Sequence, residues 1–307
     1  MSVQLQILNT SLKWVEKPFL ARVTEPAHIR RRFEMTARVW FHAPWGTKSR
    51  WDTLEHEGSS VPALWTGASL TGTKTVLYFH GGGYVFGSPR THAAMLGTLA
   101  RMAGVRACLP QYRLGPEAPF PGAVDDALAA YLALLGQGIA AQEIVIGGDS
   151  AGGGLALALL GQLLEKGYPL PAACFAFSPL TDLTFSGESM QGNEQAEVLL
   201  PAERAGDLAE MYLAGHDPMD PRASPLFADF HGAPPVWLAV GTTEILLDDT
   251  RRLVNRLTGK NVPVTVDIQD DLPHVWPIFH GVLPEARATL RELADWITQQ
   301  WPSSDDS

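Results

Sequence analysis

The sequence has few cysteines, no long apolar run and fewer basic than acidic residues, and each shortage argues against a class of protein. Two cysteines occur in 307 residues, Cys108 and Cys174, and both lie in apolar stretches. They argue against a disulfide framework or a cysteine metal site and predict free thiols in the core. No run approaches the ~20 apolar residues of a membrane-spanning helix. The net charge of −10 at pH 7 disfavours nucleic acid as a partner.

Targeting and phosphate-binding signals are also missing. Residues 1–6 contain no basic segment followed by an apolar one, so we expect no signal peptide and a cytoplasmic location. Neither glycine-rich run is followed by the Lys-Ser/Thr pair of a phosphate-binding loop, and no G-x-G-x-x-G pattern precedes an acidic strand end. A hydrophobic fraction of 46% and a mean hydropathy near zero indicate a globular chain of one large or two small domains.

The central motif is Gly148-x-Ser150-x-Gly152. It lies between an apolar, β-branched run at residues 143–146 and a helix-forming run at residues 155–160. A serine in a tight strand-to-helix turn is typical of a nucleophile elbow, and the glycines let strand and helix pass closely. The alternative is a glycine-rich turn with an incidental serine. A catalytic role for Ser150 therefore requires a base, an acid and an oxyanion hole elsewhere in the chain.

Strands alternate with helices along the chain and predict an α/β fold. Apolar strands are expected at residues 75–79, 105–110, 143–146, 172–177, 236–240 and 262–268, with a weak strand at 61–65. Such alternation implies a mainly parallel central sheet covered by helices on both faces. We interpret residues 1–45 and 185–215 as two parts of a helical cap on a core at residues 46–184 and 216–307. A basic cluster at residues 30–32 is interpreted as a solvated helix face.

Candidate catalytic groups follow the strands, because functional groups collect at the carboxyl ends of strands in open α/β sheets. The run His80-Gly81-Gly82-Gly83 comes directly after the strand at 75–79. Consecutive glycines expose backbone N–H groups, which suits the binding of an oxyanion. We expect the N–H groups of Gly81, Gly82 and Ala151 to form an oxyanion hole.

The candidate general base is His274. Among nine histidines it is the one in a loop directly after the last core strand, whereas His80 is expected to hold the glycine loop by hydrogen bonds. The order serine, acid, histidine requires a carboxylate between Ser150 and His274. Glu244 and Asp248 both follow the strand at 236–240, and Asp248 has a competing role at a helix N-terminus. We therefore favour Glu244.

Together these motifs resemble the hormone-sensitive-lipase-like family of α/β-hydrolases, the bacterial carboxylesterases grouped as family IV. The resemblance extends from about residue 61 to the C-terminal helix and rests on residues 80–84, 112–117, 148–153, 178–182, 224–226 and 273–275. It implies an α/β-hydrolase fold with a helical cap. It also implies a serine carboxylesterase that hydrolyses small, short- to medium-chain esters through an acyl-enzyme, with no metal or organic cofactor. A homodimer is compatible with it.

The sequence departs from the family pattern at the acid, which is usually the first Asp of Asp-x-Leu-x-Asp and is here Glu244. One branch of the family has a similar Glu. Leu114-Gly115 stands where Leu-Ala is more usual, with little expected effect. The residues expected to line the pocket are Tyr84, Phe86, Leu199, Tyr212, Ile245, Val275 and Trp276, and the alternative for each is ordinary core packing.

Two other functions fit parts of the pattern. An amidase or formamidase on the same scaffold uses the same groups. A ligand-binding member of the fold keeps the pocket and loses the base. The presence of both Ser150 and His274 argues against this second alternative.

Overall fold

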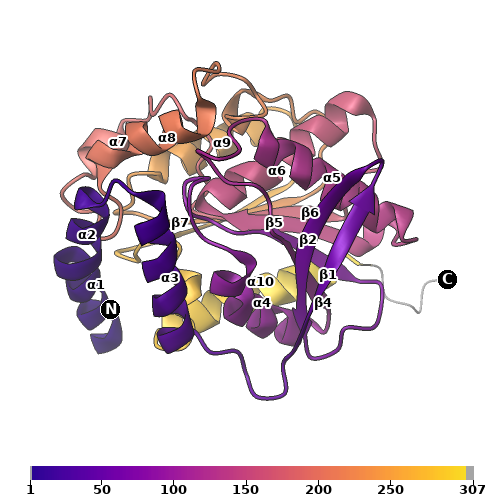
Figure 1. The fold of residues 1–307 in the computed structure, drawn as a ribbon, viewed down its shortest axis with the longest axis horizontal. Coiled ribbons are helices and arrows are strands. Elements are labelled where there is room, and N and C mark those ends of the chain that lie inside the picture. Colours follow the sequence, from indigo (N-terminus) through magenta and orange to yellow (C-terminus); the bar gives the residue numbers. More distant parts are fainter. Residues whose placement is uncertain (1, 302–307) are drawn as a thin grey trace.

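The computed structural model describes residues 2–301, so residue 1 and residues 302–307, at the ends of the expected cap and core, lie outside it. An eight-stranded sheet runs through the middle of the molecule (Figure 1). In spatial order its strands are β1 (Lys48–His56), β2 (Ser59–Gly67), β4 (Arg106–Pro110), β3 (Thr75–Phe79), β5 (Ile144–Asp149), β6 (Ala173–Phe177), β7 (Val236–Gly241) and β8 (Val264–Gln269). The β1–β2 and β2–β4 pairs are antiparallel and the other pairs are parallel. The expected mainly parallel sheet is confirmed.

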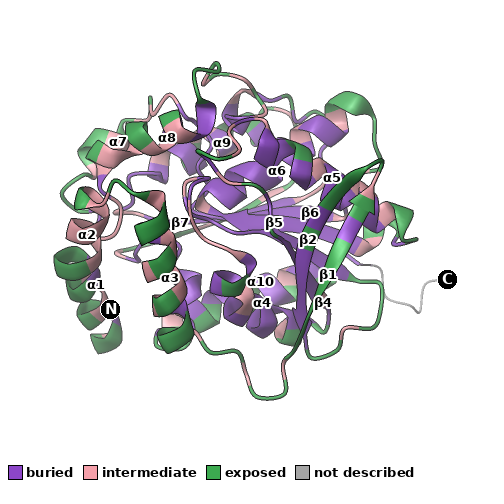
Figure 2. Ribbon diagram, viewed as in Figure 1, coloured by how far each residue is buried: buried purple, intermediate pink, exposed green. Residues whose placement is uncertain are grey.

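Successive residues of each central strand face opposite sides of the sheet, and helices complete a core on each side. From β3, Leu77 and Phe79 pack into one core and Val76 and Tyr78 into the other. The first core is covered by α5 (Gly122–Gly136), α6 (Ser150–Lys166) and α9 (Leu247–Thr258), and the second by α4 (Pro89–Ala103) and α10 (Pro284–Gln299). Burial on both faces explains why these strands are continuous apolar runs (Figure 2).

The edge strand β1 was not expected from the sequence. Its side chains are mainly polar, and Leu54 is its one buried residue. Because β1 pairs on one side only and faces solvent, no apolar pattern distinguishes it from a loop. The sheet therefore begins before the weak strand predicted at residues 61–65.

Both cysteines are free and fully buried, Cys108 on β4 and Cys174 on β6. Burial raises the pKa of each thiol well above its usual range, so neither is a thiolate at neutral pH. Within residues 2–301, no helix is both long enough and apolar enough to cross a membrane.

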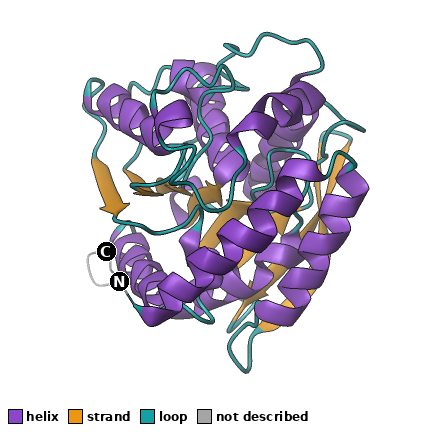
Figure 3. Ribbon diagram, turned by 90° about the vertical axis from the view of Figure 1, so that its left-hand side faces the viewer, coloured by secondary structure: helices purple, strands orange, loops and turns teal. Residues whose placement is uncertain are grey.

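Residues 3–40 form a series of helices that lie beside the sheet. The run of α1 (Val3–Ser11), a π-helical segment (Leu12–Glu16) and α2 (Lys17–Arg22) is followed by α3 (Pro26–Trp40). Figure 3 shows the molecule from the side on which these helices lie, with helices crossing in front of the strands. In the segment 185–215 the helical parts are α7 (Ser189–Gly192), a 3-10 turn (Ala202–Arg204) and α8 (Ala205–Leu213). Further 3-10 turns lie at Ala141–Glu143, Pro225–Phe227 and Trp276–Phe279.

The basic cluster at residues 30–32 is only partly a solvated face. Arg30 donates to the carbonyl oxygens of Val85 and Gly115, both at 2.8 Å, and pairs with Glu117 at 2.7 Å. Arg32 forms a 2.7 Å ion pair with a second glutamate, Glu16. The sequence interpretation is wrong for these two arginines, because both anchor α3 to other parts of the chain.

Helix α6 passes the end of strand β3 so closely that no side chain fits at Gly152. A Cβ there would overlap the carbonyl oxygens of Phe79 and His80. We expect Gly152→Ala to lower the free energy of unfolding by about 3 kcal/mol or more, or to prevent folding, because backbone atoms must move. The control is Gly206→Ala in α8, where an added Cβ meets no atom within 4 Å. Alanine should be neutral or stabilising there. Equal urea midpoints for the two variants would contradict this steric account.

Candidate active site

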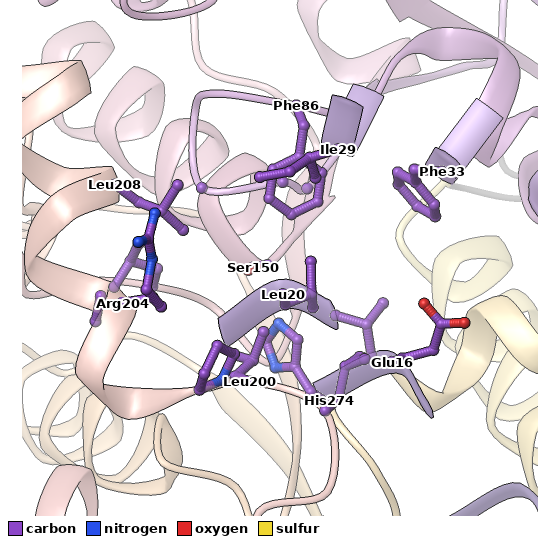
Figure 4. Close-up of a pocket in the computed structure, with 18 of the residues that line it drawn as sticks. Glu16, Leu20, Ile29, Phe33, Phe86, Ser150, Leu200, Arg204, Leu208 and His274 are labelled. Carbon is purple, nitrogen blue, oxygen red and sulfur yellow. The ribbon is translucent and has the colours of Figure 1, made fainter. Parts of the chain in front are cut away.

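Ser150 lies where β5 ends and α6 begins, and its backbone is held in the left-handed region. Its φ is +52°, which is uncommon for a residue with a side chain. The turn requires glycine at position 148 as well, since a Cβ there would overlap the backbone of Gly152. This tight turn points the serine away from the sheet, and Ser150 lines a cavity of about 230 Å³ (Figure 4).

His274 and Glu244 form a buried pair beyond the carboxyl ends of β8 and β7. Nδ1 of His274 lies 2.7 Å from Oε2 of Glu244. The other carboxylate oxygen accepts the Gly241 N–H at 2.6 Å and the Ser178 hydroxyl at 2.8 Å. Because Nδ1 donates to the carboxylate, the neutral ring presents Nε2 as an acceptor. His274 lines the same cavity as Ser150 (Figure 4).

Glu244 sets the proton affinity of this histidine. Burial by itself lowers the pKa of His274, because the charged ring loses its hydration. The hydrogen bond and the negative charge of Glu244 outweigh burial, and the net effect raises the pKa above 6.5. A histidine in this setting is well suited to take up a proton from a neighbouring hydroxyl.

The alternative acid, Asp248, is directed elsewhere. One of its oxygens accepts the N–H of Ser189 at 2.8 Å, and the other lies 3.6 Å from Arg251. Asp248 thus joins the first turn of α9 to α7. Glu244 is therefore the carboxylate that contacts His274. Asp248 lies at the N-terminus of a helix, which was its competing role in the sequence analysis.

The glycine loop requires a correction at Gly81. Its N–H donates to Oδ1 of Asp149 at 3.0 Å, so this amide is already used and cannot also bind an oxyanion. Gly82 and Gly83 line the cavity, and in residues 2–301 no acceptor is found for either N–H. Gly82 has a φ of +123°, and a Cβ there would overlap the backbone of Phe86. The second and third glycines, with Ala151 at the start of α6, are therefore the donors left for an oxyanion.

Asp149 holds this loop through a buried network that the sequence did not reveal. Its Oδ1 accepts the Tyr78 hydroxyl at 2.7 Å and lies 3.3 Å from Nε2 of His92. Burial by itself raises the pKa of Asp149, but the contacts with His92 and Tyr78 outweigh it and the net effect is a lowered pKa. No local pattern in the sequence singles out His92, which lies within α4.

His80 supports the same loop, as expected. Its Nδ1 lies 2.9 Å from the Gly81 carbonyl, its own carbonyl accepts the Tyr112 hydroxyl at 2.6 Å, and the two rings stack at 4.3 Å. Burial lowers the pKa of His80 to about 3. A ring that stays neutral in a buried stack is a structural support and not the general base.

Known proteins of similar sequence are hydrolases. Residues 76–278 match the family described as alpha/beta hydrolase fold. The chain is 42% identical over 228 residues to an acetyl-hydrolase of Streptomyces hygroscopicus, covering 74% of this chain and 76% of that protein. It is 36% identical over 232 residues to an esterase of Acinetobacter venetianus, covering 75% and 77% of the two chains.

Solved structures resemble it over almost the whole chain. A crystal structure of an esterase from the bacterial hormone-sensitive lipase family has a TM-score of 0.90 and 38% identity, over 98% of this chain and 99% of that one. A crystal structure of EstE5 has a TM-score of 0.92 and 36% identity, over 99% and 100%. The chain belongs to the bacterial hormone-sensitive-lipase family of α/β-hydrolases. The resemblance inferred from the motifs is confirmed, and the chain is a carboxylic ester hydrolase.

In this family member the cavity above Ser150 is enclosed mainly by apolar side chains from three parts of the chain. Four of the residues expected from the sequence line it: Phe86, Leu199, Ile245 and Val275. Residues that the sequence analysis did not single out include Leu12, Leu20, Ile29, Phe33, Leu200 and Leu208. All of these except Leu12 are labelled in Figure 4. They come from the N-terminal helices and from the segment between β6 and β7, so their place at the cavity depends on long-range packing.

Three of the expected pocket residues pack elsewhere. The rings of Tyr84 and Tyr212 are stacked 3.9 Å apart and fully buried, between the glycine loop and α8. Trp276 is fully buried and donates its indole N–H to Thr289 at 3.0 Å. None of the three lines the cavity. These three residues are therefore packed in the protein interior, which was the alternative given for them in the sequence analysis.

Glu197 is a further buried carboxylate close to the pair. It accepts the N–H groups of Leu199 at 2.8 Å and Ile245 at 3.3 Å, and its own carbonyl accepts from Lys17 at 2.8 Å. Burial raises its pKa, although the nearby His274 works in the opposite direction. Glu197 thereby connects the segment between β6 and β7 to both the Glu244 loop and α2.

We expect Glu244→Gln to lower the pKa of His274. The variant removes the negative charge and leaves the burial, which by itself favours the neutral ring. The titration of the His274 ring is measured by NMR. The control is Asp248→Asn, which should leave this pKa unchanged because Asp248 contacts Ser189 and Arg251 instead. An equal change in both variants would contradict the assignment of the partner.

Proposed function

We propose that this carboxylic ester hydrolase acts through a covalent acyl-enzyme formed on Ser150. The main support is one geometric observation: a serine in a strained strand-to-helix turn shares a cavity with a histidine whose Nδ1 is held by a carboxylate. This is the arrangement in which a histidine removes the proton of a serine hydroxyl.

In the proposed first half-reaction, Oγ of Ser150 attacks the ester carbonyl carbon while its proton passes to Nε2 of His274. The carbonyl oxygen becomes an oxyanion, for which the N–H groups of Gly82, Gly83 and Ala151 are the proposed donors. The C–O bond to the alcohol then breaks, and His274 protonates the leaving oxygen. Water repeats the sequence on the acyl-enzyme, so that the acid is released and the serine regains its proton.

Glu244 is the proposed third member of the triad. It fixes the ring orientation of His274 and stabilises the imidazolium that forms in each step. Its second oxygen is occupied by Ser178 and Gly241, so the carboxylate has little freedom to turn. A glutamate reaches Nδ1 here at 2.7 Å, which supports the acid favoured from the sequence.

The proposed substrates are small esters of short- to medium-chain acids. The cavity lining is mainly aliphatic and aromatic. Its charged side chains include Arg32 and Arg204, and each is neutralised in an ion pair, Arg32 with Glu16 at 2.7 Å and Arg204 with Asp207 at 3.1 Å. An uncharged acyl chain therefore suits it better than an anionic one. An amidase or formamidase would use the same catalytic groups, and the ester reading is preferred because of the esterase relatives described above.

The proposal also covers the cap, the oligomeric state and the location of the protein. Residues 1–45 and 185–215 form the cap, supported by contacts of Lys17 with the carbonyls of Glu194 and Glu197. A homodimer is supported by β8, an edge strand whose outer residues remain available for pairing. A cytoplasmic location is supported by the two unpaired cysteines.

We expect Ser150→Ala to lower kcat for p-nitrophenyl butyrate by roughly 10⁴-fold or more, because no other hydroxyl occupies the elbow. The matched control is Ser59→Ala at the exposed start of β2, which should keep wild-type kinetics. Retention of substantial activity by Ser150→Ala, with the fold intact by circular dichroism, would refute the acyl-enzyme proposal.

A series of p-nitrophenyl acetate, butyrate, hexanoate and laurate tests the proposed substrate class. We expect kcat/KM to be highest among the three shorter esters and to fall by roughly tenfold or more at laurate, because the longest chain outgrows the enclosed apolar cavity. Initial rates are measured below the micelle-forming concentration of each ester. A steady rise up to laurate would show that the acyl site is longer than proposed.

A further inference from the structure

The outer faces of the N-terminal helices carry a large share of the exposed apolar side chains. Fourteen large hydrophobic residues are exposed in residues 2–301, and eight of these lie before residue 46. We define the N-terminal apolar surface by Val3, Ile7, Trp14, Met35, Val39 and Trp40. In Figure 2 the outer sides of α1 and α3 are coloured largely as exposed. A concentration of this kind is typical of an interaction surface.

The spacing of these side chains shows that they do not serve the core. Val3, Ile7 and Trp14 follow one side of the α1 run, whereas Leu5 and Leu12 are buried. The exposed fractions of Ile7 and Trp14 are 66% and 73%. The helices therefore carry an apolar strip facing outward in addition to the buried side that packs on the protein.

The charge of the same segment is opposite to that of the rest of the chain. Residues 1–45 contain seven basic and three acidic residues, a net charge of +4, whereas the whole chain carries −10. Lys13, Arg22 and Arg31 are exposed, and no ion pair to them is found in the described part of the chain. Exposed cations thus belong to the same N-terminal segment as the apolar surface, on an otherwise acidic protein.

We propose that the N-terminal apolar surface docks on an anionic lipid surface. Exposed tryptophans beside basic side chains are the combination that favours the interface between lipid headgroups and acyl chains. Trp14 and Trp40 are 73% and 63% exposed, and Trp45, just beyond α3, is 96% exposed. The cations supply attraction to anionic headgroups, and the apolar side chains supply insertion.

A second copy of the chain fits this surface less well. Self-association through the same face would bring two segments of charge +4 together, and like charges across an interface oppose binding. The lipid proposal also has a consequence for the site. Leu12, Leu20, Ile29 and Phe33, from the same helices, line the cavity, so docking would place cavity-forming helices against the lipid. The proposal goes beyond the acyl-enzyme mechanism and does not depend on it.

The test is co-sedimentation of the full chain with vesicles of phosphatidylcholine containing about one third phosphatidylglycerol, beside vesicles of phosphatidylcholine alone. We expect binding to the anionic vesicles and a decrease with added salt. Ile7→Gln combined with Trp14→Gln should weaken this binding by roughly tenfold or more. The matched control is Tyr168→Gln combined with Met219→Gln, which removes exposed apolar side chains elsewhere and should bind like the wild type.

Hydrolysis of p-nitrophenyl butyrate without vesicles verifies that each variant is folded, since none of the four residues lines the cavity. Absence of wild-type binding to anionic vesicles would overturn the proposal, as would equal binding to both vesicle types. Equal losses in the test and control variants would also overturn it. If light scattering shows a wild-type dimer that Ile7→Gln with Trp14→Gln dissociates, the surface belongs to a second copy and the lipid proposal fails.

Discussion

The candidate site depends on a steric constraint, the close passage of helix α6 over strands β3 and β5. Gly152 packs directly against the carbonyl oxygens of Phe79 and His80, and Gly148 packs against Gly152. Because neither position has room for a side chain, the chain must turn sharply between them, and Ser150 takes the left-handed conformation that results. The same contact holds the end of β3, and hence the glycine loop that follows it, beside the serine. One packing arrangement thus positions two parts of the site that are 70 residues apart in the sequence.

Two buried carboxylates then stabilise the groups around that turn, and each is satisfied by several donors. Asp149 receives hydrogen bonds from Tyr78 and Gly81 and contacts His92, which fixes the glycine loop. Glu244 is held by Ser178, Gly241 and His274. Burying a carboxylate without such partners would cost folding free energy, and removing one partner leaves the charge of the carboxylate poorly compensated. Asp149, although adjacent to Ser150 in sequence, acts on the loop, whereas Glu244 reaches the histidine.

The sequence predicted the parts of this arrangement that follow from local rules. Ser150, Glu244 and His274 each come just after an apolar strand, and strand ends of a parallel sheet meet at one edge, so their proximity could be anticipated. The acceptor of the Gly81 N–H could not be predicted, because that group donates to Asp149, which lies on a different strand. His92 gave no signal, since its spacing in α4 is that of any buried helical residue. The edge strand β1 was missed because its exposed side chains have no apolar period.

The cavity residues of the N-terminal helices are hardest to anticipate, because the sequence of a helix shows its apolar residues but not which surface each one covers. In the N-terminal helices Leu12 and Phe33 line the cavity, whereas Trp14 and Met35, two residues further along in each case, are exposed. All four are apolar residues in helical segments, and only the three-dimensional packing shows which line the cavity and which are exposed. The inner side chains are held near the site by Arg30 and Lys17, which donate hydrogen bonds to the backbone carbonyls of Val85 and Glu197. Backbone anchors of this kind fix the position of the helices without using their outer apolar side, which therefore remains available for another surface.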